Sequence, residues 1–346
     1  MYHTYFTLLF PSLIAAAATY LSIKFAVPYM LESGVTAIDH NKKANPTLPS
    51  GIGVAAAFGF TIGILVYAFG GSFSIYTPVA SIVALFAVSL SVLMVSLVGF
   101  LDDINVKGSL VKTTDMMDTR KGMEQWQKPL IAVIGAIPLI AINAGISDIT
   151  LPFVGVVNFG IFYPLIIIPL AVVFTSNAFN LLGGFDGISS GTGTILAVAL
   201  LIYSIFYGNY IGALISGVLS ATLLVFLMFN LYPAKIIPGD SFTYFVGTAL
   251  VSAMIVGNME MFGVIIFIPW IVEFFLHASK KFKVTDLGKL GKDGKFTPPY
   301  GKKVYSWTHL IMNLKRCREW EVSMYMWGIS LFFVAVGFGA KLLGII

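Results

Sequence analysis

Charged residues are scarce in this chain of 346 residues: Asp, Glu, Lys and Arg together make up 11% of it. Soluble domains carry about 25% charged residues, so an ordinary soluble domain is excluded. Cysteine is scarcer still, because Cys317 stands alone; an internal disulfide is excluded, and the redox compartment stays open. Hydrophobic residues account for 58% of the chain, and the mean hydropathy is +0.90. This composition predicts an integral membrane protein.

The opening stretch also lacks the features of a signal peptide. It has no basic start, and its apolar run is longer than that of a signal peptide. A membrane-spanning helix needs about 20 apolar residues, and ten segments approach that length. We therefore predict an all-α membrane protein of one domain, residues 1–346, with about ten transmembrane helices. They are expected near 5–31, 51–70, 78–101, 129–146, 161–178, 188–207, 210–230, 241–257, 259–277 and 321–343.

The distribution of Lys and Arg predicts the orientation of the chain. Only Lys24 and Lys341 lie outside the loops of one face, so that face carries 19 of the 21 basic residues. The positive-inside rule makes this face cytoplasmic, and an even number of spans then places both termini outside. The largest basic loop, 278–320, precedes the last helix and is expected to form a cytoplasmic subdomain.

Acidic residues gather on the same face. Of the 16 Asp and Glu residues, only Asp148 and Glu260 fall clearly on the outer side. Carboxylates mixed with lysines favour a cation-assisted site for an anionic substrate, although solvated loop charges explain part of the pattern. They explain Asp102 and Asp103 poorly, because these neighbours abut an apolar helix, repel each other and are costly to desolvate. A cation is expected beside them.

Two candidate segments place polar side chains before a helix. Asp39, Asn41 and Lys42 precede two prolines, which is typical of a shaped loop that leads into a helix, or of a plain loop. Lys128 stands at the start of the span near 129–146. A lysine at that place is a topology determinant or a snorkelling cation, or else a phosphate ligand. These alternatives stay open.

Two further segments carry amide and carboxylate side chains. Asn177 and Asn180 precede a Gly-rich break and can share one helix face; an amide oxygen suits magnesium, but a helix cap also explains it. Asp186 follows in the break, as a sugar contact or a cap, and glycines such as Gly183 allow a ligand to approach the backbone. Asp240 is predicted at the N-cap of the next helix, where metal or phosphate binding is also favoured.

The long basic loop is the fifth candidate segment. A hairpin is predicted with its turn at Asp293-Gly294. An amphipathic helix is predicted over 306–316, lying at the membrane interface. The lysines of the loop either attract anionic lipid or hold a pyrophosphate, and both interpretations stay open.

These five segments, in this order, resemble those of the polyprenyl-phosphate N-acetylhexosamine-1-phosphate transferases. The motifs are D-x-N-K over 39–42, the paired Asp102 and Asp103, NAFNLL over 177–182 and GDSFTYFVG over 239–247. Each motif alone is weak, but the ordered set covers most of the chain. The last motif is most similar to the branch that acts on UDP-GlcNAc and dolichyl phosphate. The ten spans, cytosolic active face and outward termini of that family agree with the topology predicted from charge.

The resemblance implies roles for the candidate residues. Asp240 and Asn180 would hold Mg²⁺, with Mn²⁺ as an expected substitute. Asp102 and Asp103 would lie beside the metal, and Lys128 would contact phosphate; these three are the implied catalytic residues. The implied substrate-binding residues are Asp39, Asn41, Lys42, Asn177, Asp186, Lys281 and Lys283.

Departures from the family pattern restrict which sugar donors are expected. Gly183 stands where the branch that transfers phospho-MurNAc-pentapeptide has an Asp, and the last inner loop lacks the His-rich motif of that branch. Lys280, Lys281 and Lys283 stand where the GlcNAc branch has a basic Arg/His cluster. These departures argue against a MurNAc-pentapeptide substrate and leave the identity of the pyrophosphate ligands open.

The reaction implied by the resemblance is transfer of GlcNAc-1-phosphate from UDP-GlcNAc to a dolichyl-type polyprenyl phosphate, with release of UMP. This is the first step of lipid-linked glycan assembly. Another UDP-N-acetylhexosamine or UDP-MurNAc-pentapeptide is the alternative donor. An anionic-solute transporter is a remote alternative, since transporters place their sites near the membrane midplane in repeated halves. The expected partners are both substrates and the lipid bilayer, without nucleic acid; a homodimer, and the choice between cell membrane and endoplasmic reticulum, stay open.

Overall fold

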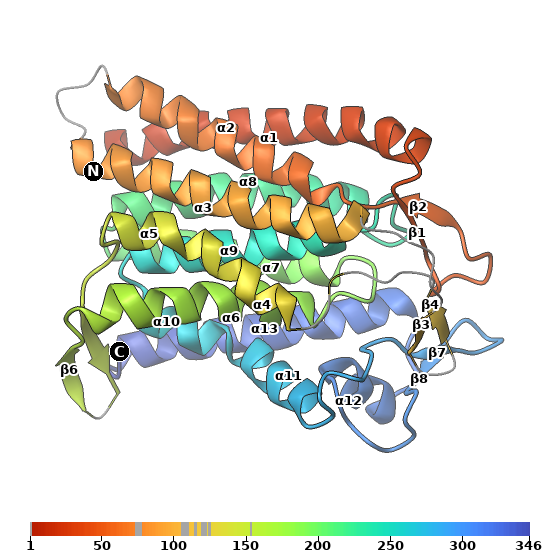
Figure 1. Ribbon diagram of the computed structural model, residues 1–346. Helices are drawn as coiled ribbons and strands as arrows, with labels where there is room; N and C mark the ends of the chain where they lie inside the picture. Colours follow the sequence, from red (N-terminus) through yellow and green to blue (C-terminus); the bar gives the residue numbers. More distant parts are fainter. Residues whose placement is uncertain are drawn as a thin grey trace.

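The structure, a computed structural model, consists largely of helices that run side by side (Figure 1). It describes residues 2–72, 78–104, 111–113, 116–118, 123, 126–152 and 154–346. Four short antiparallel hairpins complete the described part. The predicted all-α membrane class is confirmed.

The described residues form thirteen α-helices and two irregular helical turns. The helices are α1 (Tyr2–Glu32), α2 (Gly53–Ser72), α3 (Val79–Ile104), α4 (Gln127–Ala132), α5 (Ile137–Ala141), α6 (Ile168–Asn180), α7 (Ile188–Phe206), α8 (Tyr210–Asn230), α9 (Gly239–Val256), α10 (Glu260–Ile266), α11 (Ile268–Ala278), α12 (Trp307–Leu314) and α13 (Glu319–Leu342). A 3₁₀ turn, η1 (Val133–Ala136), joins α4 to α5, and a π-helical turn, η2 (Tyr163–Ile167), leads into α6.

All ten segments predicted to span the membrane contain helices, but they are not equivalent. Eight helices of the described part are long and apolar enough to cross a membrane alone. The pair α10 and α11 would make a ninth span, bent by 57° at a break next to Pro269, which has no backbone N–H to donate to the preceding turn. The segment predicted near 129–146 is a shorter apolar helix, Gln127–Ala141. The predicted number of about ten thus includes one bent and one short segment.

Helix α9 runs through the middle of the bundle. Every residue from Ser241 to Ile255 is buried. Two glycines bring its neighbours close: a Cβ on Gly99 of α3 would lie 2.6 Å from the Asp240 backbone, and one on Gly247 would lie 2.5 Å from the Thr175 carbonyl oxygen of α6. Helices α3 and α6 therefore meet α9 backbone to backbone.

The four hairpins lie at the two ends of the bundle. Figure 1 shows three of them at the end where α3 finishes and α9 begins, which we call the inner end; β5–β6 and both termini lie at the opposite, outer end. The strands pair as β1 (Thr36–Ile38) with β2 (Thr47–Pro49), β3 (Val111–Thr113) with β4 (Met116–Asp118), β5 (Asp148–Leu151) with β6 (Gly155–Asn158), and β7 (Lys289–Leu290) with β8 (Phe296–Thr297).

The basic loop after α11 folds back on the bundle. Strands β7 and β8 pair across a turn in which Gly294 has a φ of +75°, which confirms the hairpin predicted at Asp293-Gly294. Helix α12 is the predicted amphipathic helix, but its apolar side faces protein: Ile311 belongs to one buried cluster with Phe185 and with Val322 of α13. The predicted place of this helix at the membrane interface stays a prediction.

We expect Gly99→Ala to destabilise the bundle, because the added methyl group would meet the α9 backbone. Overpacking of this kind costs about 1–3 kcal/mol. The measurement is the temperature of half-unfolding of the purified protein in detergent. Gly328→Ala in α13 is the matched control, since a Cβ there meets no described atom within 4 Å. An equal fall in both variants would contradict this packing account.

Candidate active site

Polar side chains from four helices meet at the inner end. Because each helix is otherwise apolar, each of these groups needs a partner to be stable there. They are Asp102 and Asp103 from the last turn of α3, Lys128 from the first turn of α4, Asn180 at the end of α6 and Asp240 in the first turn of α9.

Lys128 joins two of the carboxylates. Its Nζ lies 2.8 Å from Oδ2 of Asp102 and 2.6 Å from Oδ2 of Asp240. The cation expected beside the acidic pair is thus provided in part by Lys128. One ammonium group between two ionised carboxylates leaves an excess negative charge.

Asp103 has a different role from its neighbour. Its Oδ1 accepts a hydrogen bond of 2.8 Å from the backbone N–H of Asp240, and its Oδ2 accepts one of 3.0 Å from that of Ser241. These N–H groups belong to the first turn of α9, where no partner exists within the helix and where the helix dipole favours a negative charge. Asp103 therefore caps α9 from α3. A Cβ on Gly239 would lie 2.5 Å from this carboxylate, which explains the glycine.

The predicted N-cap role of Asp240 is wrong. Helix α9 begins at Gly239 with Pro238 at the N-cap and without a side-chain cap bond, so Asp240 lies inside the first turn. Because Asp103 already occupies the cap, the Asp240 carboxylate is directed to Lys128 instead.

Asn177 and Asn180 both face α9, as their spacing predicts. Oδ1 of Asn180 accepts a 2.8 Å hydrogen bond from the Thr243 hydroxyl, and Oδ1 of Asn177 accepts one of 3.3 Å from the Tyr244 hydroxyl. The Thr243 hydroxyl also lies 3.2 Å from the backbone oxygen of Asp240. Thr243 thus places the Asn180 amide beside the turn that carries Asp240.

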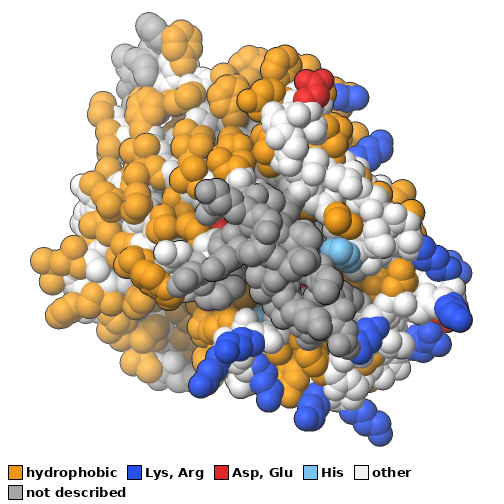
Figure 2. Space-filling view, turned by 45° about the vertical axis from the view of Figure 1, so that its right-hand side comes forward, with side chains coloured by type: hydrophobic (Ala, Val, Ile, Leu, Met, Phe, Trp, Pro, Cys, Tyr) orange, Lys and Arg blue, Asp and Glu red, His pale blue; other side chains and the backbone are white. Residues whose placement is uncertain are grey.

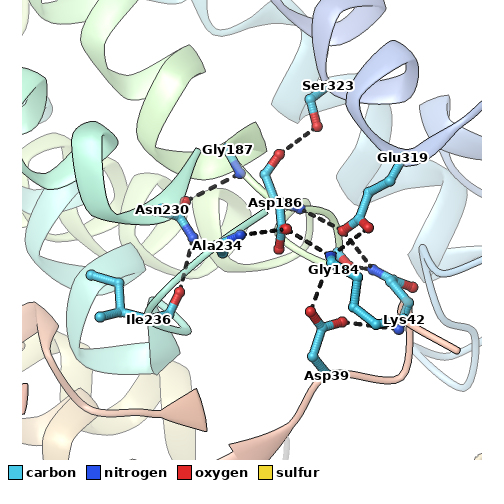
Figure 3. Close-up of polar contacts among 11 residues, drawn as sticks. Asp39, Lys42, Gly184, Asp186, Gly187, Asn230, Ala234, Ile236, Glu319 and Ser323 are labelled. Carbon is cyan, nitrogen blue, oxygen red and sulfur yellow. Dashed lines mark hydrogen bonds and ion pairs between the residues drawn. The ribbon is translucent and has the colours of Figure 1, made fainter. Parts of the chain in front are cut away.

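A second polar cluster surrounds Lys42 (Figure 3). Its Nζ lies 3.0 Å from Asp39, 2.7 Å from Asp186 and 2.5 Å from Glu319, measured to carboxylate oxygens. Burial opposes the charged form of Lys42, but hydrogen bonds and charge interactions with Asp186 and Glu319 outweigh burial and raise its pKa well above the ordinary value. Lys42 is therefore a permanent cation that holds three carboxylates from distant parts of the chain together.

The Gly-rich break over 183–187 is held by side chains of other segments. Asp286 accepts hydrogen bonds from the N–H groups of Gly183 (3.0 Å) and Gly184 (2.8 Å), Glu319 accepts one from Asp186 (3.1 Å), and Asn230 accepts one from Gly187 (3.2 Å). The group that approaches the glycine backbone is thus a carboxylate of the chain itself. The N–H groups of Gly183 and Gly184 are thus already bonded, but both glycines also line a cleft, so backbone approach by a ligand stays a prediction.

A cleft of about 260 Å³ opens against the second cluster. Asp39, Asn41 and Asp186 line it, together with Leu287 of the basic loop. Pro238, two residues before Asp240, also lines it, so the cleft reaches the start of α9. Three of the predicted substrate-binding residues therefore share one recess that leads towards the Lys128 cluster.

Lys281 and Lys283 stand apart from both clusters. Both side chains are exposed, and neither takes part in an ion pair among the residues that the structure describes. Figure 2 shows Lys and Arg side chains around the rim of this side of the molecule. Pyrophosphate binding by these two lysines stays a prediction.

Sequence reasoning does not find Glu319 or Asp286. Each stands in a charged stretch of the basic loop region, where acidic side chains usually pair with nearby lysines, and their partners lie more than 100 residues away. One usable signal exists for Glu319: it adjoins the last apolar span, as Asp102 and Asp103 adjoin the third.

We expect Asp103→Ala to lower the free energy of unfolding by about 1–3 kcal/mol, since two buried N–H groups of α9 would lose their acceptor. Thermal unfolding in detergent measures this loss. Asp293→Ala is the control, because its ion pair with Arg316 is exposed and such pairs contribute about 0–1 kcal/mol. An unchanged Asp103→Ala protein would refute the capping role.

Comparison with known proteins places these motifs in a family. Residues 85–258 match the family described as glycosyl transferase family 4. A protein of Saccharolobus solfataricus is 34% identical over 335 residues, which cover 95% of each chain. One of Sulfolobus acidocaldarius is 31% identical over 93% of this chain and 92% of its own. Both carry the name "Putative UDP-N-acetylglucosamine–dolichyl-phosphate N-acetylglucosaminephosphotransferase". A Shouchella clausii protein named phospho-N-acetylmuramoyl-pentapeptide-transferase is 29% identical over 96% of each chain. The chain belongs to glycosyl transferase family 4.

Proposed function

We propose that this protein transfers GlcNAc-1-phosphate from UDP-GlcNAc to a dolichyl-type polyprenyl phosphate and releases UMP. The observation that carries the proposal is the meeting of Asp102, Lys128 and Asp240 at the inner end. A lysine and a set of oxygen ligands at one membrane face suit a reaction between two phosphate groups, one of them on a lipid. The names of the archaeal relatives support the choice of substrates.

The oxygen atoms of the Lys128 cluster suit Mg²⁺. Carboxylates of Asp102 and Asp240 and the amide oxygen of Asn180 are hard ligands, and the excess negative charge beside Lys128 calls for another cation. The described residues contain no group of three or more His, Cys, Asp or Glu arranged to hold a metal ion. Mg²⁺ takes few protein ligands and completes its shell with water and substrate phosphate. Asp240 and Asn180 would hold the ion, which supplies charge neutralisation for the diphosphate.

The reaction does not require a strong general base. The second pKa of a phosphate monoester is about 6, so the acceptor is mostly dianionic at neutral pH. One of its oxygens attacks the sugar-bearing phosphorus of UDP-GlcNAc, and the bond to the bridging oxygen breaks with release of UMP. Lys128 would orient phosphate oxygens, and Asp102 would hold Lys128 in place. Asp103, which is committed to the α9 backbone, would position Asp240.

An apolar groove can take the lipid chain of the acceptor. It has a volume of about 550 Å³ and lies among β5, η2, α6, α9, α10 and α11, with a lining that runs from Ile149 and Glu260 at the outer end to Phe174. Thr175, also in its lining, precedes Asn177 by two residues on α6. A polyprenyl chain in this groove would bring its phosphate towards the Lys128 cluster.

The inner end would face the cytoplasm. The loops at that end carry nearly all Lys and Arg residues, and both termini lie at the outer end (Figure 1). We expect Leu343→Cys, whose position is exposed, to react with a membrane-impermeant maleimide on intact cells. Asp293→Cys should react only after permeabilisation, and the buried Cys317 of the parent chain is the background control. The reverse pattern would overturn the orientation.

The reaction is tested by following UMP release from purified protein with UDP-GlcNAc and a short-chain polyprenyl phosphate. We expect release that depends on Mg²⁺ and falls by about a hundredfold or more in Asp240→Ala, because a ligand and the partner of Lys128 are both lost. Asp148→Ala at the outer end should behave as the parent protein.

Other outcomes of this assay discriminate between the alternatives. Release with a different UDP-sugar but not with UDP-GlcNAc would change the donor and keep the reaction. Folded protein that releases no UMP with any UDP-sugar, but takes the label into vesicles, would replace the transferase by a transporter.

A further inference from the structure

We propose that Glu319, at the start of the last helix, is a positioning residue for the nucleotide-sugar donor. Figure 3 shows it directed from α13 to Lys42 and to the Gly-rich break. The inference rests on the proposed function, because it takes the cleft lined by Asp39, Asn41 and Asp186 as the binding site of the donor in that reaction.

Glu319 contacts Lys42 and two groups of the cleft wall. Its Oε2 lies 2.5 Å from Nζ of Lys42, and its Oε1 accepts hydrogen bonds from the backbone N–H of Asp186 (3.1 Å) and the amide of Asn41 (3.4 Å). The residue is only 3% exposed. Asn41 and Asp186 line the cleft, whereas Glu319 does not. It therefore acts on a bound ligand through its neighbours and not by contact.

The charges around Lys42 explain why a carboxylate is needed at position 319. Asp39 and Asp186 both depend on Lys42 for charge balance, and Asp186 also accepts a 2.9 Å bond from the N–H of Ala234. Without Glu319, Lys42 would lose one of its three anchors, and the buried N–H of Asp186 would lose its acceptor. The side chains of the cleft wall would then adopt more than one arrangement, because buried polar groups keep one geometry only when each has a hydrogen-bond partner.

The last helix stays attached to the break without this side chain. The Ser323 hydroxyl donates to the Asp186 carbonyl (2.6 Å), and the Trp327 indole N–H donates to that of Gly187 (3.0 Å). Each of these contacts lies one further turn along α13. Removal of the Glu319 carboxylate is therefore expected to disturb the cleft wall and to leave the docking of α13 intact.

This arrangement predicts an effect on donor binding and not on chemistry. Glu319 contacts the Lys42 cluster, while the reacting phosphates belong to the Lys128 cluster. A change in binding that is equal in the ground state and the transition state raises KM and leaves kcat unchanged. The acceptor lipid, which enters from the apolar groove, should be unaffected.

The experiment compares Glu319→Gln, Glu319→Ala and Glu321→Gln in purified protein in detergent. We expect Glu319→Ala to raise KM for UDP-GlcNAc about tenfold, because the binding-competent arrangement of Asn41 and Asp186 would become a minor fraction of the population. Glu319→Gln keeps an oxygen acceptor for Asp186 and should raise KM less. KM for the polyprenyl phosphate and kcat should stay near the parent values, whereas the temperature of half-unfolding of Glu319→Ala should fall, because the N–H of Asp186 and the ammonium group of Lys42 lose a partner.

Glu321→Gln is the matched control, because it makes the same charge change two residues along the same helix. Glu321 pairs with Lys315 and with the N–H of Arg318, away from the cleft. If Glu319→Ala fails to fold, Glu319→Gln carries the test. An unchanged KM for UDP-GlcNAc in Glu319→Gln, or equal changes in Glu319→Gln and Glu321→Gln, would overturn the inference. A parent protein that releases no UMP would instead overturn the proposed function, and the inference with it.

Discussion

The ion pairs of Lys128 with Asp102 and Asp240 connect the parts of the inner end. They join Asp102 at the end of α3 to Asp240 at the start of α9, 138 residues further along the chain, through a lysine in the first turn of α4. Separate carboxylates at the ends of apolar helices would each be costly to bury. Held around one ammonium group, they form a site that still carries excess negative charge. The proposed roles of the metal and of the diphosphate both follow from that remaining charge.

Backbone packing gives these charges their geometry. Gly99 and Gly247 let α3 and α6 touch α9, and Asp103 then reaches the free N–H groups at the start of α9. Asp103 therefore fixes the start of α9, whereas its neighbour Asp102 pairs with the ammonium group of Lys128. The same principle recurs at the Gly-rich break, where Asp286 and Glu319 hold backbone N–H groups from a distance.

The residue types and their order predict much of this arrangement, but not the partners. Apolar run length predicts the helices, and a carboxylate that abuts an apolar run marks Asp102, Asp103 and Asp240 as unusual. Local rules then mislead at Asp240, because an acid near a helix start is usually its own cap, and the cap here comes from another helix. Contacts such as Glu319 with Lys42, 277 residues apart, depend on tertiary packing, and spacing along the chain does not encode them.

In the proposed reaction the Lys128 cluster binds a divalent cation together with the donor diphosphate. The most direct test is the electron spin echo spectrum of Mn²⁺ added to the protein with UDP-GlcNAc, since Mn²⁺ reports nearby phosphorus. We expect bound Mn²⁺ coupled to phosphorus in the parent protein and loss of that bound signal in Asp240→Ala. Equal Mn²⁺ binding in both proteins, or bound Mn²⁺ without phosphorus coupling, would contradict it.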